Sequence, residues 1–481
     1  MQKASLAKNS IYSAIRSFLS VAFPLITLKY ASVVLGADGL GKVEFSKSFV
    51  SYFLLLAGLG IESLAVRNGS AQRDDKIALN NFSSSVFSLN ILSSVTALLL
   101  LSVCITLIPQ VRENAALVAI FAVQIPLALV GMEWVYYIFE NYRYIALRTL
   151  ICQIVALILL FTLVKSDRNI WLYAVVLVIA TYGANVIGYI CSRKYVQLKP
   201  RINRSAFRYF PEAMVLFFNT LATSVYVNSD VTMMGFLSTE REIGIYSVAV
   251  KIYTAVKTLV TAVLNVTMPR LTYYFNNDHM DEYYNVQRTV AKVLILLIPP
   301  AMVGVIMQSR NLILFISGEG FLGAVPALVI LSVAVVFSTV AMLCSATVLM
   351  PQKKEKTTLM STVCGALSNL GLNFFLIPMY GGAGAAMTTL IAELVVAGVQ
   401  MRDSFRTLQA AKLKIGKDLV RAVIGCVGVV ATCMCVRMLN LHYLLDMMVA
   451  VVASVAVYLV IQILLKNELL MPLLQKIRHR K

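Results

Sequence analysis

The chain has 481 residues, of which 59% are hydrophobic and only 14% are charged, and its mean hydropathy is +0.80. Charged residues alone make up about 25% of a typical soluble domain, so this composition excludes a soluble globular protein and predicts a polytopic membrane protein. The formal net charge of +19 does not indicate a nucleic-acid partner, because no soluble basic domain is present to bind one.

Apolar segments long enough for a helix to cross about 30 Å of hydrocarbon recur along the whole chain, about fourteen times. The first follows Lys3 and Lys8, as in a secretory signal, but it has no small-residue cleavage site and continues to Val34. We therefore predict an all-α polytopic membrane protein. The predicted spans are 11–34, 43–63, 82–108, 115–138, 145–164, 171–191, 211–236, 244–268, 290–309, 325–350, 358–378, 383–401, 419–437 and 446–465.

Basic residues are distributed unevenly between the two sides that these spans define. If the N-terminus is cytoplasmic, thirty Lys and Arg residues fall on the cytoplasmic side and seven on the opposite side. Cytoplasmic loops of membrane proteins carry an excess of Lys and Arg, so the pattern predicts that both termini are cytoplasmic.

Two glycine-containing segments, LGADGLGKVEF at 35–45 and GFLSTEREIGIYS at 235–247, each join an odd-numbered span to an even-numbered one on the outer side. We interpret them as marks of an internal repeat about an axis along the membrane normal; a general preference of short turns for glycine is the alternative. The predicted parts are an N-terminal lobe (1–192), a basic cytoplasmic linker (193–210), a C-terminal lobe (211–402), and two further helices with a basic tail (403–481).

The predicted span at 244–268 contains two lysines far from either end, Lys251 and Lys257. A lysine at the centre of a membrane helix costs roughly 2.5–3.5 kcal/mol on insertion scales, and such residues usually face a wet cavity or a partner. At about 100° per residue the two lie on one broad polar flank, with threonine and tyrosine between them. We interpret this flank as the wall of an anion-binding cavity; structural pairing or snorkelling to the interface is the alternative.

Four carboxylates, Glu62, Glu133, Asp230 and Glu393, lie in or near apolar spans. Each has three possible roles: pairing with a basic residue, binding a coupling cation, or exchanging a proton. Pairing with a basic residue is the role we expect by default.

Other classes of function lack their motifs. The chain has no nucleotide-binding glycine-rich loop with its lysine, and its histidines, His279, His442 and His479, are isolated. We therefore predict no metal site and no cofactor. The polar connections are short, so no soluble catalytic domain is attached, and we expect a protein that is not an enzyme.

Motifs of one family run through the chain in order. A proline-bearing first span is followed by Leu35-Gly36 and Gly39-x-Gly41, and then by Gly58, Gly60 and Arg67; later motifs are Asp230, Gly235, Gly244-Ile245-Tyr246-Ser247, Pro269-Arg270 and NLGLNFFLIPMYGGAGAAMTTLIAE at 369–393. Together they resemble the bacterial polysaccharide flippases, of O-antigen, capsule or teichoic-acid type, in the multidrug/oligosaccharidyl-lipid/polysaccharide exporter superfamily.

The resemblance implies two six-helix lobes around a central cavity, with two C-terminal helices. It also implies translocation of polyprenyl-diphosphate-linked oligosaccharide repeat units from the cytoplasmic to the periplasmic leaflet of the bacterial inner membrane, by alternating access. The bilayer and the lipid-linked glycan are the expected partners, and a polysaccharide polymerase and a chain-length regulator are further ones that this function allows.

Alternatives of the same fold are a cation-coupled drug or metabolite antiporter and a peptidoglycan-precursor flippase. A membrane glycan polymerase or ligase is the alternative from another class, but it would need a larger outer loop than this chain has.

Within the expected cavity, basic side chains would bind the diphosphate, because ammonium and guanidinium groups form ion pairs with phosphate oxygens. We assign this role to Arg16, Lys251 and Lys257. Sugars need hydroxyl, amide and aromatic groups, and the candidates near the same spans are Tyr226, Asn228, Tyr246, Tyr253 and Asn265.

Overall fold

The computed structural model describes residues 6–199, 206–413 and 415–472, with backbone alone at 6–18, 20, 206 and 219. These residues form helices and connecting turns, and no β-strand occurs among them. Their contacts divide the chain into two compact units, unit 1 (Met1–Gly244) and unit 2 (Ile245–Lys481). The division by lobes at 192 and 211 stays a prediction.

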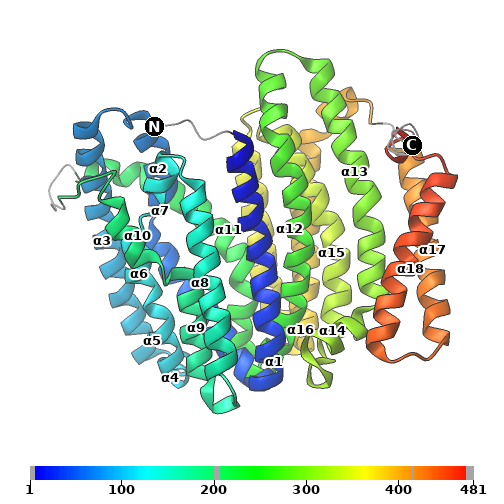
Figure 1. The fold of residues 1–481 in the computed structure, drawn as a ribbon, viewed down its shortest axis with the longest axis horizontal. Helices are drawn as coiled ribbons and strands as arrows, with labels where there is room; N and C mark the ends of the chain where they lie inside the picture. Colours follow the sequence, from blue (N-terminus) through cyan, green and yellow to red (C-terminus); the bar gives the residue numbers. More distant parts are fainter. Residues whose placement is uncertain (1–5, 200–205, 414, 473–481) are drawn as a thin grey trace. The chain divides into compact units, whose positions relative to one another are not determined.

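Unit 1 is a bundle of helices whose course can be followed in blue to green in Figure 1. Its elements are α1 (Leu6–Gly58), α2 (Ile61–Ala71), α3 (Lys76–Leu107), α4 (Pro109–Glu113), α5 (Ala115–Ala122), α6 (Gln124–Gly131), α7 (Glu133–Ile138), α8 (Tyr142–Leu163), η1 (Asp167–Asn169), α9 (Ile170–Tyr182), α10 (Asn185–Ser192), η2 (Ala206–Tyr209), α11 (Phe210–Leu237) and the first turn of α12 (Glu240–Asn276).

Unit 2 continues from α12 and is also helical throughout its described residues. Its further elements are α13 (Met280–Met307), α14 (Ser309–Ser317), η3 (Glu319–Phe321), α15 (Ala324–Cys344), the π-helical η4 (Ser345–Leu349), α16 (Glu355–Ala410), α17 (Gly416–Met438) and α18 (Tyr443–Leu464).

The described residues contain twelve helical stretches that are long and apolar enough to cross a membrane. Two of them hold two spans each, because α1 is broken at Gly36 (φ 68°) and α16 at Gly381 (φ 53°), so twelve stretches contain the fourteen predicted spans. Residues with a Cβ atom rarely adopt such positive φ angles, whereas glycine does so at little cost. The prediction of an all-α polytopic membrane protein is confirmed.

The helix ends differ from the predicted ends of the apolar spans. Residues 269–289 were expected to form a polar connection, but α12 and α13 continue through this segment and leave only 277–279 between them. The predicted span 115–138 is in turn divided into α5, α6 and α7, with Met132 in a left-handed conformation before α7. Hydropathy marks the part of a helix that lies in hydrocarbon, and polar residues prolong a helix beyond it.

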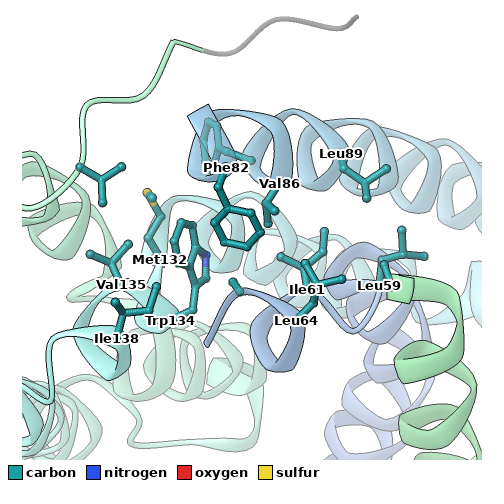
Figure 2. Packing of buried hydrophobic residues seen from close by; sticks show 14 of the residues in the cluster. Leu59, Ile61, Leu64, Phe82, Val86, Leu89, Met132, Trp134, Val135 and Ile138 are labelled. Carbon is teal, nitrogen blue, oxygen red and sulfur yellow. The ribbon is translucent and has the colours of Figure 1, made fainter. Parts of the chain in front are cut away.

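A hydrophobic core in unit 1 joins α2, α3 and α7 (Figure 2). Trp134 of α7 lies beside Phe82 of α3, and Ile61 and Leu64 of α2 pack against the same cluster. Each of these four side chains is at most 5% exposed. Burial of this size contributes roughly 1.5–3 kcal/mol for each large apolar side chain, measured against water.

Glycines allow α1 to approach the start of α12 closely. A methyl group at Gly41 would lie 1.7 Å from the carbonyl oxygen of Glu240, and one at Gly244 would lie 1.9 Å from that of Ala37. The two glycine-containing segments that suggested a repeat therefore pack against each other within unit 1.

The same contact continues along α11. The ring of Phe45 lies over Gly235, where a methyl group would be 2.0 Å from it, and the hydroxyls of Ser48 and Thr232 are 2.7 Å apart. Residue numbers rise along α1 while they fall along α11, so the two helices are antiparallel.

The C-terminal helices α17 and α18 lie side by side, and α17 packs on α13. The hydroxyl of Tyr458 in α18 donates to the carbonyl oxygen of Leu296 in α13 at 2.8 Å. Beyond the end of α18, Lys292 of α13 pairs with Glu468, and this hydrogen-bonded ammonium lowers the pKa of the Glu468 carboxyl.

The contact between α1 and α12 predicts that alanine substitution will have very different effects on stability at two glycines of α1. Gly41→Ala should lower the apparent Tm of the purified protein by an amount corresponding to about 1–3 kcal/mol, because the neighbouring atom is a backbone oxygen that cannot rotate away. Gly58→Ala is the control, since no atom would come within 4 Å of the added methyl group. Equal Tm values for the two variants would contradict the close approach.

Candidate functional site

The strongest candidate site lies on α12, the helix that carries both predicted lysines. Lys257 is 17 residues after the first residue of α12 and 19 before its last, so it lies near the middle of the helix. At 1.5 Å per residue it is roughly 25 Å from each end, at a depth where hydrocarbon surrounds a spanning helix.

Lys257 forms a compact cluster with Glu393 of α16 and Tyr253 of α12. The Lys257 ammonium donates to Oε1 of Glu393 at 2.8 Å and to the hydroxyl oxygen of Tyr253 at 3.1 Å. The Tyr253 hydroxyl donates to the same Oε1 at 2.6 Å. The lysine ammonium also lies 5.0 Å from the centroid of the Tyr253 ring, within cation–π range.

The two charged side chains of this cluster differ in exposure. The Glu393 side chain is 3% exposed, whereas that of Lys257 is 25% exposed. Since an ammonium group has three N–H donors, the two bonds to Glu393 and Tyr253 leave Lys257 a third donor. The cluster thus holds a cation at a fixed place while its ammonium-bearing side chain stays partly accessible.

The position of Glu393 depends on how the two arms of α16 pair, one before Gly381 (355–380) and one after it (382–410). Asn369 donates to Thr388 at 3.2 Å, and Thr388 donates to Asn373 at 2.6 Å. A methyl group at Gly384 would lie 2.0 Å from the carbonyl oxygen of Leu376. These contacts define an antiparallel hairpin.

The same pairing continues toward the far ends of the arms. Gln400 donates to Ser361 at 2.9 Å, and Thr357 donates to Asp403 at 2.7 Å. In an antiparallel hairpin the numbers of two facing residues add up to a constant. The sum is nearly the same for these two pairs as for the pairs near Gly381, so one register holds over the whole hairpin. Glu393 lies within this register, which fixes its height along α16.

The two other residues predicted to bind the diphosphate are Lys251 and Arg16. Lys251 is half-buried on α12, six residues before Lys257. Arg16 falls on α1 where side chains lie outside the described residues. Their roles stay predictions.

Of the five residues predicted to contact sugars, Tyr253 is part of the cluster. Tyr246 is buried against Gly382 of α16, whereas Asn265 is exposed. Tyr226 and Asn228 are half-buried on α11, in unit 1, where the Asn228 amide donates to Ser224 at 3.4 Å.

Among the four predicted carboxylates, Glu133 also pairs with a basic residue. Its partner is Arg148 of α8, which is 7% exposed. A methyl group at Gly188 would lie 2.7 Å from Nη1 of Arg148, so this glycine provides the space for the guanidinium group. The Arg148 side chain is 6% exposed and that of Glu133 is 28% exposed, so the guanidinium group is enclosed while the carboxylate is partly accessible.

The remaining two carboxylates occupy different environments. Asp230 is buried on α11, with 7% of the residue exposed, and Glu62 is exposed in the first turn of α2. Asn369, Asn373 and Thr388 are buried polar residues that the sequence analysis did not select. Their sequence signals are that they fall within the motif at 369–393 and that polar side chains interrupt apolar spans there.

No group of three or more His, Cys, Asp or Glu side chains arranged to hold a metal ion occurs among the described residues.

The fold and the sequence can be compared with known proteins. A protein from Escherichia coli (strain K12) named "Putative O-antigen transporter" is 21% identical over 403 residues, which cover 83% of this chain and 96% of that protein. A protein of the same name from Shigella dysenteriae is 22% identical over 387 residues, which cover 78% of this chain and 93% of that one.

Two solved structures share the fold. The inward closed conformation of the lipid II flippase MurJ has a TM-score of 0.76 at 17% identity, over 96% of this chain and 99% of that chain. The inward-facing conformation of a multidrug resistance MATE family transporter of the MOP superfamily has a TM-score of 0.60 at 15% identity, over 82% of this chain and 95% of that chain.

The family model of the polysaccharide biosynthesis proteins matches residues 6–275. This range contains 270 of the 481 residues and therefore more than half of the chain. Together with the membrane spans, the match shows that the chain belongs to the polysaccharide biosynthesis protein family.

Proposed function

We propose that this protein is a lipid-linked oligosaccharide flippase. It moves polyprenyl-diphosphate-linked repeat units from the cytoplasmic to the periplasmic leaflet of the bacterial inner membrane by alternating access, with both of its termini in the cytoplasm. The family match supports a role in polysaccharide assembly. The names of the relatives and of the fold neighbours support transport rather than catalysis.

The observation that carries this proposal is the partly exposed cation in the middle of α12. Taking a charged pair out of water often costs more than its Coulomb attraction returns, and well-packed apolar residues frequently stabilise a protein as well or better. Lys257 and Glu393 are therefore a costly way to hold α12 and α16 together. Binding of an anion by Lys257 explains why the charges are present.

In this proposal Lys257 alternates between two anionic partners, Glu393 and the diphosphate of the cargo. Without cargo, the carboxylate neutralises Lys257, so the membrane interior does not hold a lone cation. An arriving diphosphate competes with Glu393 for the ammonium, and its departure restores the original pair. In this scheme Arg16 and Lys251 supply further positive charge, and Tyr226, Asn228, Tyr246 and Asn265 contact the sugars in one or another state of the cycle.

The membrane potential supplies a driving force without a coupling ion. The cytoplasm is negative, and an anion leaving it gains about 2.3 kcal/mol per charge for each 100 mV. A doubly charged diphosphate is thus driven in the direction of export. The carboxylates available to a coupling cation or proton are Asp230, Glu62, Glu133 and Glu393.

Transporters of the same fold that carry other cargoes can be distinguished by testing which substrate this protein transports. The oligosaccharide flippase should restore surface polysaccharide in a strain that lacks its own, whereas a drug antiporter should raise resistance and a peptidoglycan-precursor flippase should sustain cell-wall synthesis. A polymerase and a chain-length regulator are proposed partners in the polysaccharide pathway.

Neutralising the cluster in two steps tests the role of Lys257. Glu393→Gln keeps the cation but removes its competitor, so export should be slowed at cargo release and still exceed that of the double variant. Lys257→Gln combined with Glu393→Gln should reduce export at least about tenfold, since hydrogen bonds to charged groups contribute roughly 1.5–3 kcal/mol. Surface polysaccharide would be measured together with the amount of protein in the membrane.

The double substitution avoids a complication of the single one. Lys257→Gln alone leaves Glu393 buried without a cation, and breaking a buried pair in this way costs about 3–5 kcal/mol of stability. Normal polysaccharide display by the folded double variant would remove Lys257 from the transport mechanism.

Collapsing the membrane potential should slow translocation. In sealed vesicles holding the purified protein and labelled lipid-linked glycan, an ionophore that abolishes the potential removes the electrical gain on both charges of the diphosphate. An unchanged rate of translocation would show that the membrane potential is not the driving force.

A further inference from the structure

Unit 1 contains a cavity of about 760 Å³ at the start of α3. Its walls come from the first turns of α3 and from the segment that leads into α11. The lining residues are Gln72, Ile77, Ala78, Asn80, Asn81, Phe82, Ser84, Ser85, Gln197, Lys199, Arg208 and Tyr209.

The cavity has a defined framework. Asn80 and Ser84 are four residues apart on α3, so they lie on one face of that helix. The Asn80 side chain accepts a hydrogen bond from the backbone N–H of Gln197 at 2.8 Å, and Ser84 accepts one from that of Lys199 at 3.0 Å. These two bonds hold the segment 197–199 along the polar face of α3.

Aromatic packing connects the opposite wall to the core. The rings of Phe82 and Tyr209 meet edge to face with centroids 5.1 Å apart. Phe82 is 2% exposed and belongs to the cluster around Trp134 in Figure 2. Tyr209, which is half-buried, is therefore held against a rigid part of unit 1 while its neighbour Arg208 is exposed.

The lining has the chemistry of a site for a phosphorylated sugar. It carries two cations, Lys199 and Arg208, and no carboxylate among its described residues. Asp75 lies nearby, but its carboxylate accepts from the backbone N–H groups of Ile77 and Ala78 and so caps α3. Primary amides and serine hydroxyls supply the donors and acceptors that sugar hydroxyls require.

Apolar side chains around the cavity favour a ligand that is attached to a membrane. Ile77 is 75% exposed, and Phe207 and Phe210, on either side of Arg208 and Tyr209, are 46% and 40% exposed. Exposed aromatic side chains beside basic ones are typical of the level where lipid headgroups meet water. A cytoplasmic position of this segment follows from the predicted orientation.

We propose that this cavity binds the phosphate-bearing sugar headgroup of a membrane lipid on the cytoplasmic side, before the lipid is translocated. The inference rests on the proposed function and extends it by a second, peripheral site for the same class of cargo. The headgroup's phosphate oxygens contact Lys199 and Arg208, and its sugar contacts the amides and serines of α3.

Binding to the full-length protein in lipid nanodiscs tests this site. The probe is a short-chain polyprenyl diphosphate carrying one N-acetylhexosamine, and its Kd would be measured for the unchanged protein and two variants. Lys199→Gln with Arg208→Gln should weaken binding at least about tenfold. Lys76→Gln with Lys194→Gln is the matched control, because it removes two exposed charges that lie near the cavity but do not line it.

Further probes identify the part of the ligand that is recognised. A nucleoside-diphosphate N-acetylhexosamine, which has the sugar and phosphates without the lipid, should bind more weakly than the lipid probe. Nanodiscs of phosphatidylglycerol should not displace the lipid probe at equal mole fraction. Equal binding of the soluble sugar nucleotide, displacement by phosphatidylglycerol, or equal Kd values for the two double variants would each overturn the proposal.

The test is independent of the transport mechanism. The variant with Lys257→Gln and Glu393→Gln should bind the probe with the Kd of the unchanged protein, because its substitutions lie in unit 2; loss of binding would place the probe at that cluster and overturn the proposal. If the unchanged protein binds the probe in this cavity but does not translocate it, the proposed function fails while the site stands.

Discussion

A polar side chain inside a membrane protein has no surrounding water to bond with, so it must find a partner on a neighbouring helix. This constraint organises both units. In unit 2, Asn369, Asn373 and Thr388 bond with one another and so set the pairing of the α16 arms. In unit 1, Arg148 reaches Glu133 through the space that Gly188 leaves.

The cations of the two charged pairs differ in how accessible they are. Arg148 is 7% exposed and tightly enclosed, whereas the side chain of Lys257 is 25% exposed. A transporter must bind its cargo firmly enough to select it and weakly enough to release it. A cation that already has an internal carboxylate as a competitor, as Lys257 has in Glu393, meets both demands, because the carboxylate replaces the cargo as it leaves.

The sequence was sufficient to predict the fourteen spans, because the bilayer requires a long apolar run for every helix that crosses it. It also identified Lys257 and Glu393 as charges that hydrocarbon does not tolerate alone. It could not pair them, since 136 residues separate the two positions and pairing was one of three roles open to Glu393. Helix ends were missed because hydropathy does not report where a polar helix continues.

The α16 hairpin holds Glu393 through a shared register rather than through one contact. Each residue of a helix turns the next side chain by about 100° and moves it along the axis by 1.5 Å. Deleting one residue between Gly381 and Glu393 would leave both arms helical, yet it would swing the carboxylate away from Tyr253 by more than a quarter turn. Gly384 and Thr388 are constrained by their contacts with the other arm, and insertions or deletions must fall outside this segment or be balanced in both arms.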